Sequence, residues 1–554
     1  MKITMKAKYL GVGLLTALVT LSSCNDFLDT NPTDKVTKKI VWENPSYAEM
    51  AINYFYADIP NLGPFNNYQC TAGLPEGLTD ELKYGNMNYN SLCFIPSEIS
   101  YGGVILSPNY VDVYMGVWGS TYEEIRRVNE ALSNLAVATF GDADKKRFEG
   151  ELRFFRGMYY FELMKRYGQA ILYTADLSQI NTDKALNSEA DCWKFIYDDL
   201  KFAAQNLPTS TSATGRLTSG AAWAMMSRAM LYAKNWAAVK EAGDAIFQMG
   251  YTLTATYPEA FQSGNSEAIF QYTYDAASNI THDFDSYYAP GGDHTLAGLT
   301  SNTGGYGTPT QDMVEEYELA TGGKPNWATW HTTTGTTTEP PYTQLEPRFK
   351  ATILYNGATW RNRTIEPFVG GADGWCQWQV EPKADGRTTT GYYLRKLVDE
   401  KHDYPTLQAS TQPFIAFRLA EVYLNYAEAC FRLGDNTKAM EYINKVRTRV
   451  SLPNVSGLSG DDLFDAIRHE RKVEMAFEGL YYWDMRRWNL ASTQFSGVRR
   501  HGLKVEKNAS GTFTYTYVNV DNQNLNFPEK MYRLPIPTAE LNNNKELTQF
   551  AEWK

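Results

Sequence analysis

The feature that most constrains the fold is a series of amphipathic helical patterns arranged in pairs. Between residues 147 and 167, apolar side chains recur every three or four positions, which is the period of a helix with one buried face. Gly168 follows directly and indicates a helix end. Similar patterns predict further helices over residues 191–207, 218–233, 236–249, 419–433, 437–450 and 461–479. Short turns at 233–236 and 433–436 join antiparallel neighbours. The sequence therefore predicts a mainly α fold, a superhelix of tetratricopeptide-like helical pairs, with a large loop-rich region.

The middle of the chain has a different composition. Residues 275–410 are rich in Gly, Thr, Pro, Trp and Tyr, and residues 60–117 resemble them. Disordered segments are poor in aromatic residues, so these segments are expected to be ordered loops on a helical scaffold. We expect an N-terminal helical part over 41–274 with an insertion at 60–117, a loop-rich, ligand-facing region over 275–410, and a C-terminal helical part over 411–554.

The N-terminus predicts export and lipid attachment. Lys2, Lys6 and Lys8 precede an apolar run over residues 9–21, and Leu21-Ser-Ser-Cys24 then resembles a bacterial lipobox. The run is too short to span a bilayer, which takes about 20 apolar residues. We expect residues 1–23 to be a lipoprotein signal peptide, Cys24 to be lipidated, and residues 24–40 to form a leash to the membrane. An ordinary signal peptide that happens to precede a cysteine is the alternative.

The charge of the chain limits its partners. The formal net charge is −11, and removal of the signal peptide with its three lysines makes the chain more acidic. A polyanion of this size is a poor partner for DNA, RNA or anionic lipid. No nucleic-acid partner is expected.

Motifs that indicate catalysis or metal binding are missing. His469-Glu470 begins like a zinc-protease motif, but Val473 stands where the second histidine is needed. Glu470, Glu474 and Glu478 fall on one predicted helix face, where two of them could act as a glycosidase pair. Neighbouring arginines make an ion-pair network the favoured interpretation. We expect no catalytic residue, no enzyme activity and no cofactor, and the sequence leaves open a structural calcium ion.

A set of motifs distributed along the whole chain indicates its family. The most specific motif is Gly150-Glu-Leu-Arg-Phe-Phe-Arg. The other motifs are residues 24–29, 118–129, 215–232, 390–396, 418–429, 443–447, 467–479, 484–488 and 534–537. In these segments, and in their order, the sequence resembles the SusD/RagB family of bacterial outer-membrane lipoproteins. The resemblance implies a helical superhelix on the cell surface that captures glycans beside a SusC-like TonB-dependent transporter and is not an enzyme. Ligand contacts vary within the family, so none is carried over to this chain.

The expected binding residues come from the chemistry of sugars. Aromatic rings stack on the apolar faces of a pyranose, and charged or amide side chains bind its hydroxyls. The loops offer Asp80, Lys83, Tyr84, Tyr89, Tyr287, Trp327, Trp330, Trp375 and Trp378 as candidates. The competing interpretation is that each ring packs its loop onto the helices. Two other functions stay open, a peptide-binding import lid of the RagB type and a helical adaptor without a small ligand.

Overall fold

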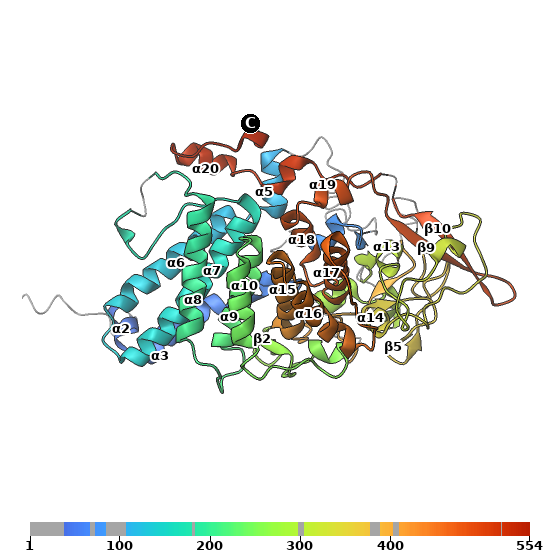
Figure 1. Cartoon of the computed structure of the whole chain (residues 1–554), viewed down its shortest axis with the longest axis horizontal. Helices are drawn as coiled ribbons and strands as arrows, with labels where there is room; N and C mark the ends of the chain where they lie inside the picture. Colours follow the sequence, from blue (N-terminus) through green and yellow to red (C-terminus); the bar gives the residue numbers. More distant parts are fainter. Residues whose placement is uncertain are drawn as a thin grey trace, which may run out of the picture.

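Two neighbouring stacks of antiparallel helices form the scaffold of the molecule (Figure 1). The computed structural model describes residues 38–66, 73–84, 107–179, 183–296, 304–376, 388–402, 409–521 and 523–554. The first stack contains α6 (Trp118–Ala136), α7 (Asp142–Tyr167), α8 (Glu189–Asn206), α9 (Ser219–Tyr232) and α10 (Trp236–Ile246). The second contains α15 (Leu419–Arg432), α16 (Asn436–Arg449), α17 (Gly460–Glu474) and α18 (Tyr481–Arg487). The prediction of a mainly α, paired-helix fold is confirmed.

Local signals explain where these helices begin and end. Gly168 takes a left-handed conformation with φ of 68° and ends α7. The side chain of Thr218 accepts a hydrogen bond from the N–H of Ala221 and begins α9. Asn235 begins α10 in the same way through the N–H of Ala238. The expected helix boundaries therefore lie close to the observed ones.

Helix α17 is shorter than the sequence predicts. It ends at Glu474 rather than at Gly479. Phe477 has φ of 61°, so the chain leaves the helix and turns this buried ring inward. Glu478 then approaches Arg418 from a turn, at 2.6 Å between carboxylate and guanidinium atoms.

The remaining segments are short helices and small sheets. The short helices are α2 (Lys38–Glu43), α3 (Pro45–Asn53), η2 (Tyr54–Leu62), η3 (Pro75–Leu78), α5 (Pro108–Met115), η4 (Leu177–Gln179), η5 (Tyr257–Phe261), α11 (Phe284–Tyr288), α12 (Gly291–Leu296), α13 (Gln311–Val314), η6 (Trp327–Thr329), α14 (Pro347–Thr352), α19 (Ala491–Gln494), η8 (Glu529–Tyr532), α20 (Thr538–Asn543) and η9 (Ala551–Trp553). The strands are β1 (Leu82–Tyr84), β2 (Ala268–Tyr272), β3 (Gly307–Pro309), β4 (Ile353–Leu354), β5 (Thr359–Trp360), β6 (Arg363–Thr364), β7 (Tyr393–Leu394), β8 (Phe414–Arg418), β9 (His501–Lys507) and β10 (Phe513–Asn519).

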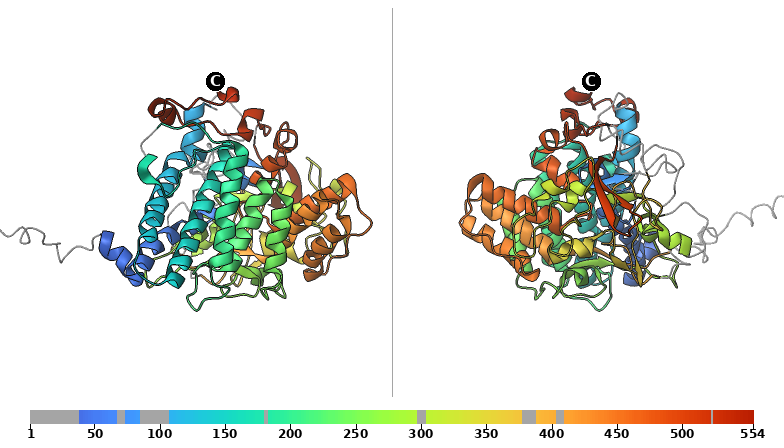
Figure 2. Two further views of the ribbon diagram at one scale, coloured as in Figure 1. Left: turned by 60° about the vertical axis from the view of Figure 1, so that its left-hand side comes forward. Right: turned by 90° about the vertical axis from the view of Figure 1, so that its right-hand side faces the viewer.

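The strands pair two by two and antiparallel, as β1 with β3, β2 with β8, β4 with β7, β5 with β6, and β9 with β10. Four of these pairs lie within the irregular part or join it to the helices, and the β9–β10 hairpin crosses its outer side (Figure 1). Helices α6 to α10 stand side by side as one layer in the left view of Figure 2. Most buried apolar side chains belong to one continuous core that runs from the helices into this irregular part. Aromatic rings therefore fasten the loops to the scaffold.

The glutamates of α17 belong to a buried ion-pair network, but the arginines that bind them come from α14, β8 and α16 rather than from neighbouring positions in the sequence. Glu474 binds Arg348 at 3.1 Å and also binds Arg418 and Arg449. Burial alone would raise the pKa of Glu474, but the three guanidinium groups lower it well below its usual range. Glu470 bonds Arg348 at 2.6 Å. This network ties the second helix stack to the irregular part through α14 and β8.

Among the residues that the structure describes, no helix combines the length and the apolar character needed to cross a membrane. Cys24, the predicted signal peptide and almost all of the leash lie outside the described residues. Their lipidation and anchoring stay predictions.

Candidate functional site

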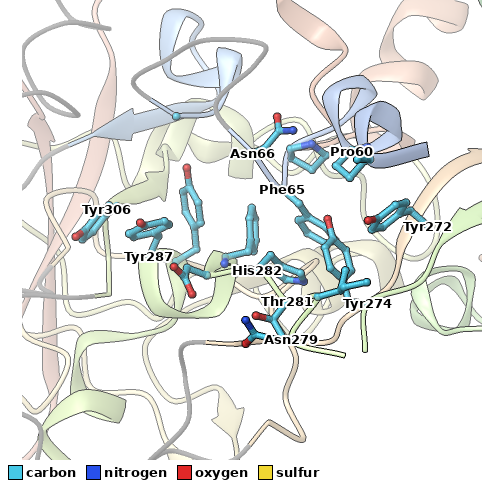
Figure 3. A pocket seen from close by; sticks show the side chains of 17 residues that line it. Pro60, Phe65, Asn66, Tyr272, Tyr274, Asn279, Thr281, His282, Tyr287 and Tyr306 are labelled. Carbon is cyan, nitrogen blue, oxygen red and sulfur yellow. Dashed lines mark hydrogen bonds between the residues drawn. The ribbon is translucent and has the colours of Figure 1, made fainter. Parts of the chain in front are cut away.

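Aromatic rings line a cavity in the loop-rich part of the molecule (Figure 3). Its volume is about 790 Å³, within the range of small-ligand sites. We call it the tyrosine pocket. Its aromatic lining is Phe65, Tyr272, Tyr274, His282, Phe284, Tyr287, Tyr288 and Tyr306. These residues come from the segment after η2, the end of β2 and the turn that follows it, α11, and the approach to β3.

A buried histidine organises the centre of this pocket. The ring of His282 stacks on Phe65 with centroids 4.3 Å apart, and Tyr274 meets it edge-on at 4.5 Å. Its Nδ1 accepts a hydrogen bond from the N–H of Phe284, so Nε2 carries the proton and donates to the carbonyl of Gln412 at 3.0 Å. Burial lowers the pKa of His282, which keeps the ring neutral.

Two tyrosine pairs stand at opposite ends of the pocket (Figure 3). At one end, Tyr287 and Tyr306 have centroids 4.8 Å apart, and Tyr306 donates its N–H to the carbonyl of Tyr287. Tyr287 is 39% exposed, so much of its ring is open to solvent. At the other end, Tyr272 and Tyr274 meet edge-on at 4.9 Å.

Polar side chains line the space between the tyrosine pairs. Asn66, Asn279, Thr281 and Asp283 all line the pocket, and three of them are labelled in Figure 3. Together they offer amide donors and acceptors, a hydroxyl and a carboxylate. The pocket thus combines accessible aromatic edges with neutral and acidic hydrogen-bonding groups, a combination that suits a polyhydroxylated ligand.

Of the nine residues expected to contact sugar, Tyr287 lines the tyrosine pocket directly. Tyr84 supports it from behind, since its hydroxyl lies 2.5 Å from that of Tyr288 and accepts the N–H of Leu74. Lys83 is fully buried, with its ammonium 3.9 Å from Asp521. The expectation that Lys83 and Tyr84 are exposed is wrong, because β1 pairs with β3 and is covered on both faces.

The two central tryptophans are also covered. Trp327 is 5% exposed and Trp330 is 8% exposed. Their rings meet edge-on at 5.4 Å, and the indole N–H of Trp330 donates to the carbonyl of Thr338. The expectation of an exposed stacking platform at these two residues is wrong, because they form the small core that holds their own loop in place.

The other candidates lie elsewhere. Asp80 binds Lys472 at 2.9 Å and lines a separate, highly charged cleft of about 440 Å³. Trp375 is half-buried and forms a backbone bridge with Thr388, outside the tyrosine pocket. Tyr89 and Trp378 fall outside the described residues, so their role in binding stays a prediction.

Tyr272, Tyr274, Tyr306 and His282 line the pocket but are not among the residues predicted from the sequence. Tyr272 and Tyr274 lie just before residue 275, where the ligand-facing region is predicted to begin. The signal that was available is the spacing Tyr272-Thr-Tyr274, which ends a strand just before a polar turn. In a strand, this spacing directs both rings to the same side.

In the part of the chain that the structure describes, no group of three or more His, Cys, Asp or Glu residues is arranged to hold a metal ion.

Fold and pocket together define a helical scaffold that carries an aromatic ligand pocket on its loops. A family model described as "SusD family" matches residues 266–553. A second model, described as "Starch-binding associating with outer membrane", matches residues 93–231. Since the first match covers more than half of the sequence, the chain belongs to the SusD family.

Individual relatives agree with this assignment. A SusD-like protein of Bacteroides ovatus is 25% identical over 542 residues, which cover 91% of this chain and 88% of the relative. The starch-binding protein SusD of Bacteroides thetaiotaomicron is 22% identical over 450 residues, or 74% of each chain. The crystal structure of a SusD-like protein from Bacteroides fragilis superposes with a TM-score of 0.73 at 26% identity, covering 92% of this chain and 98% of that one.

Proposed function

We propose that the tyrosine pocket binds carbohydrate and that the protein captures oligo- or polysaccharide at the outer membrane for delivery to a SusC-like TonB-dependent transporter. The observation that carries the proposal is the partly exposed ring of Tyr287, which packs on the buried Tyr306 beside amide and carboxylate groups. Membership of the SusD family supports the same ligand class, as does the starch-binding description of the model that matches residues 93–231.

The chemistry of the lining favours sugar over peptide. The accessible rings of Tyr287 and Tyr272 provide stacking surface, and a threonine and two asparagines provide hydroxyl partners, around a space of about 790 Å³. That volume is suitable for a short oligosaccharide. A peptide lid would instead be expected to offer a long apolar groove or a row of unpaired strand edges. The experiment below includes peptides as the alternative ligand class.

Weak binding is expected and fits capture followed by release. Aromatic stacking contributes about 0.5–1.5 kcal/mol beyond area burial, and a net hydrogen bond contributes about 1 kcal/mol. After ordering costs, a few such contacts give dissociation constants from micromolar to millimolar. Repeated sugar units along a polymer raise the avidity without making any single contact tight.

Anchoring and the absence of catalysis are further parts of the proposal. The lipobox-like Leu21-Ser-Ser-Cys24 supports a lipid anchor at Cys24, and the outer-membrane description of the second family model supports the location. Glu470, Glu474 and Glu478 are saturated by buried arginines and lysine, which supports a structural rather than catalytic role.

Affinity electrophoresis in gels that contain amylopectin, laminarin, xylan or casein peptides tests the ligand class. We expect retardation by at least one neutral polysaccharide and none by the peptides. Tyr287→Ala should weaken that retention roughly five- to tenfold, because one stacking surface is removed. The matched control is Tyr47→Ala, which removes an exposed tyrosine on α3 outside the pocket. Retention by peptide alone, or equal retention of the Tyr287→Ala and control proteins, contradicts the proposal.

A further inference from the structure

A second cleft lies between the start of α6 and the end of α20. Its volume is about 420 Å³, and it shares no lining residue with the tyrosine pocket. The first two turns of α6 form one wall, the extended chain at Ile171 and Tyr173 forms another, and residues 540–544 close the third side. Figure 1 shows α20 at the top of the molecule, beside the helix stack to which α6 belongs.

The aromatic wall of this cleft is rigidly held. Tyr122 and Tyr173 meet at right angles with centroids 5.9 Å apart, and Trp118 packs on Tyr122 at 5.1 Å. The hydroxyl of Tyr122 accepts the N–H of Ile171 at 2.6 Å. The backbone of Tyr173 is fixed by Tyr160, whose hydroxyl accepts its N–H. Two tyrosines are thus positioned in a half-buried site before any ligand arrives.

Free polar groups face these rings. Within the described structure, the side chains of Glu540 and Asn543 take part in no hydrogen bond or ion pair, although both line the cleft. Burial, together with the nearby carboxylates of Glu540 and Asp183, raises the pKa of the Tyr173 hydroxyl. Glu540 is half-buried and Asn543 is exposed, so a carboxylate and an amide at the mouth of the cleft are available to a polyhydroxylated ligand in exchange for water.

The charge balance narrows the ligand class. Glu123, Asp183 and Glu540 line the cleft together with Arg126, and the ammonium of Lys184 lies 4.7 Å from the centroid of the Tyr173 ring. Arg126 is itself paired with Glu130 on α6 at 3.4 Å. The cleft therefore has no excess of cations that would favour an acidic sugar or a phosphorylated ligand over a neutral one. A neutral sugar has the apolar faces and the hydroxyls that this wall and these groups can bind.

We infer that the α6–α20 cleft is a second carbohydrate site. It binds one or two neutral sugar units. The inference rests on the proposed function in taking carbohydrate as the ligand class. Two weak sites on one protein raise retention on a polymer more than either site alone.

Gly119 allows a clean test. It lines the cleft, and a Cβ atom added there meets nothing within 4 Å, so a side chain at this position enters the cleft without disturbing the backbone. Gly119→Leu fills the space, and Gly119→Ala is the matched control. Glu540→Ala removes one polar group that has no partner among the described residues.

The measurement is saturation-transfer NMR on the mature full chain with glucose, galactose, mannose and xylose at millimolar concentration, and with glucuronate and galacturonate as charged counterparts. Each sugar is compared on wild-type, Tyr287→Ala, Gly119→Leu, Gly119→Ala and combined Tyr287→Ala/Gly119→Leu proteins. We expect the Tyr287→Ala protein to keep a neutral-sugar signal, and addition of Gly119→Leu to weaken that binding roughly tenfold or more. Glu540→Ala should weaken it less, and Gly119→Ala should leave it unchanged.

The remaining outcomes separate the two sites. If Tyr287→Ala alone abolishes the sugar signal, the second site is overturned and the tyrosine pocket stands. The same holds if Gly119→Leu leaves the remaining signal of the Tyr287→Ala protein unchanged. A signal lost only with Gly119→Leu supports the cleft and contradicts the tyrosine pocket. Equal binding of uronates at the cleft overturns the assigned chemistry, and no signal from any sugar on the wild-type protein overturns both proposals.

Discussion

The hydroxyl oxygens of Tyr84 and Tyr288 lie 2.5 Å apart and join strand β1 to the back of the tyrosine pocket. Tyr84 is buried, and its oxygen also accepts the N–H of Leu74 at 2.6 Å. A residue expected to touch ligand therefore supports the residues that line the pocket. Loss of a supporting residue lowers stability, whereas loss of a contact residue lowers sugar binding, so substitutions distinguish the two roles.

Tyr84→Phe is expected to destabilise the protein. It removes the acceptor of a buried N–H, and an unsatisfied buried donor costs about 1–3 kcal/mol. Urea unfolding should show this loss, whereas Tyr47→Phe, at an exposed site, should not change the free energy of unfolding. A folded Tyr84→Phe protein with unchanged stability would show that the contact is unimportant.

Trp330→Ala is expected to affect stability and leave sugar binding intact. Removing a buried tryptophan costs about 3–5 kcal/mol. Its indole packs on Trp327 and donates to Thr338, outside the tyrosine pocket. Thermal unfolding and affinity electrophoresis should be measured on the same preparation. Loss of polysaccharide retention with unaltered stability would restore this tryptophan as a contact residue.

Glu474→Gln is expected to be among the most destabilising single changes. Its carboxylate is fully buried among Arg348, Arg418 and Arg449, and removing one partner of a buried ion pair costs about 3–5 kcal/mol. The free energy of unfolding in urea provides the measurement. The control is Glu339→Gln, which removes the same charge at an exposed position. If Glu474→Gln lowers the free energy of unfolding no more than this control does, the network does not stabilise the fold as argued.

Glu76→Gln is expected to stabilise the protein at alkaline pH. Burial, partly opposed by the N–H of Gly479, raises the pKa of Glu76 to about 7. The folded state therefore holds a proton that the unfolded state releases near pH 4.5, so this carboxyl weakens the fold as pH rises from about 4.5 through 7. The glutamine variant lacks this titration and should gain up to about 3 kcal/mol over wild type above pH 7.

Urea unfolding between pH 5 and pH 8 checks this sign. The difference between Glu76→Gln and wild type should grow with pH over that range. Glu81, whose two carboxylate oxygens are buried without a partner in the described structure, should keep part of the slope in the variant. A difference that shrinks as pH rises would mean that Glu76 is stabilised in its charged form.

The helices could be predicted from the sequence because their signals are local. Periodicity and end signals such as Thr218, Asn235 and Gly168 act within one or two turns, so the paired-helix class and most boundaries follow from neighbouring residues. The end of α17 was the exception. There Phe477 adopts a positive φ within a continuous helical pattern, and its burial against other elements overrides the local preference.

The helical class, the family resemblance and the presence of aromatic loops follow from residues close together in the chain. The exposure of each aromatic ring depends instead on how distant segments pack. Trp330 and Tyr287 both come from the same loop-rich region, yet one is enclosed by its own loop and the other opens into a pocket with Tyr272 and Tyr274. The burial of a ring depends on which distant segments pack against it, and local sequence patterns do not show which segments these are.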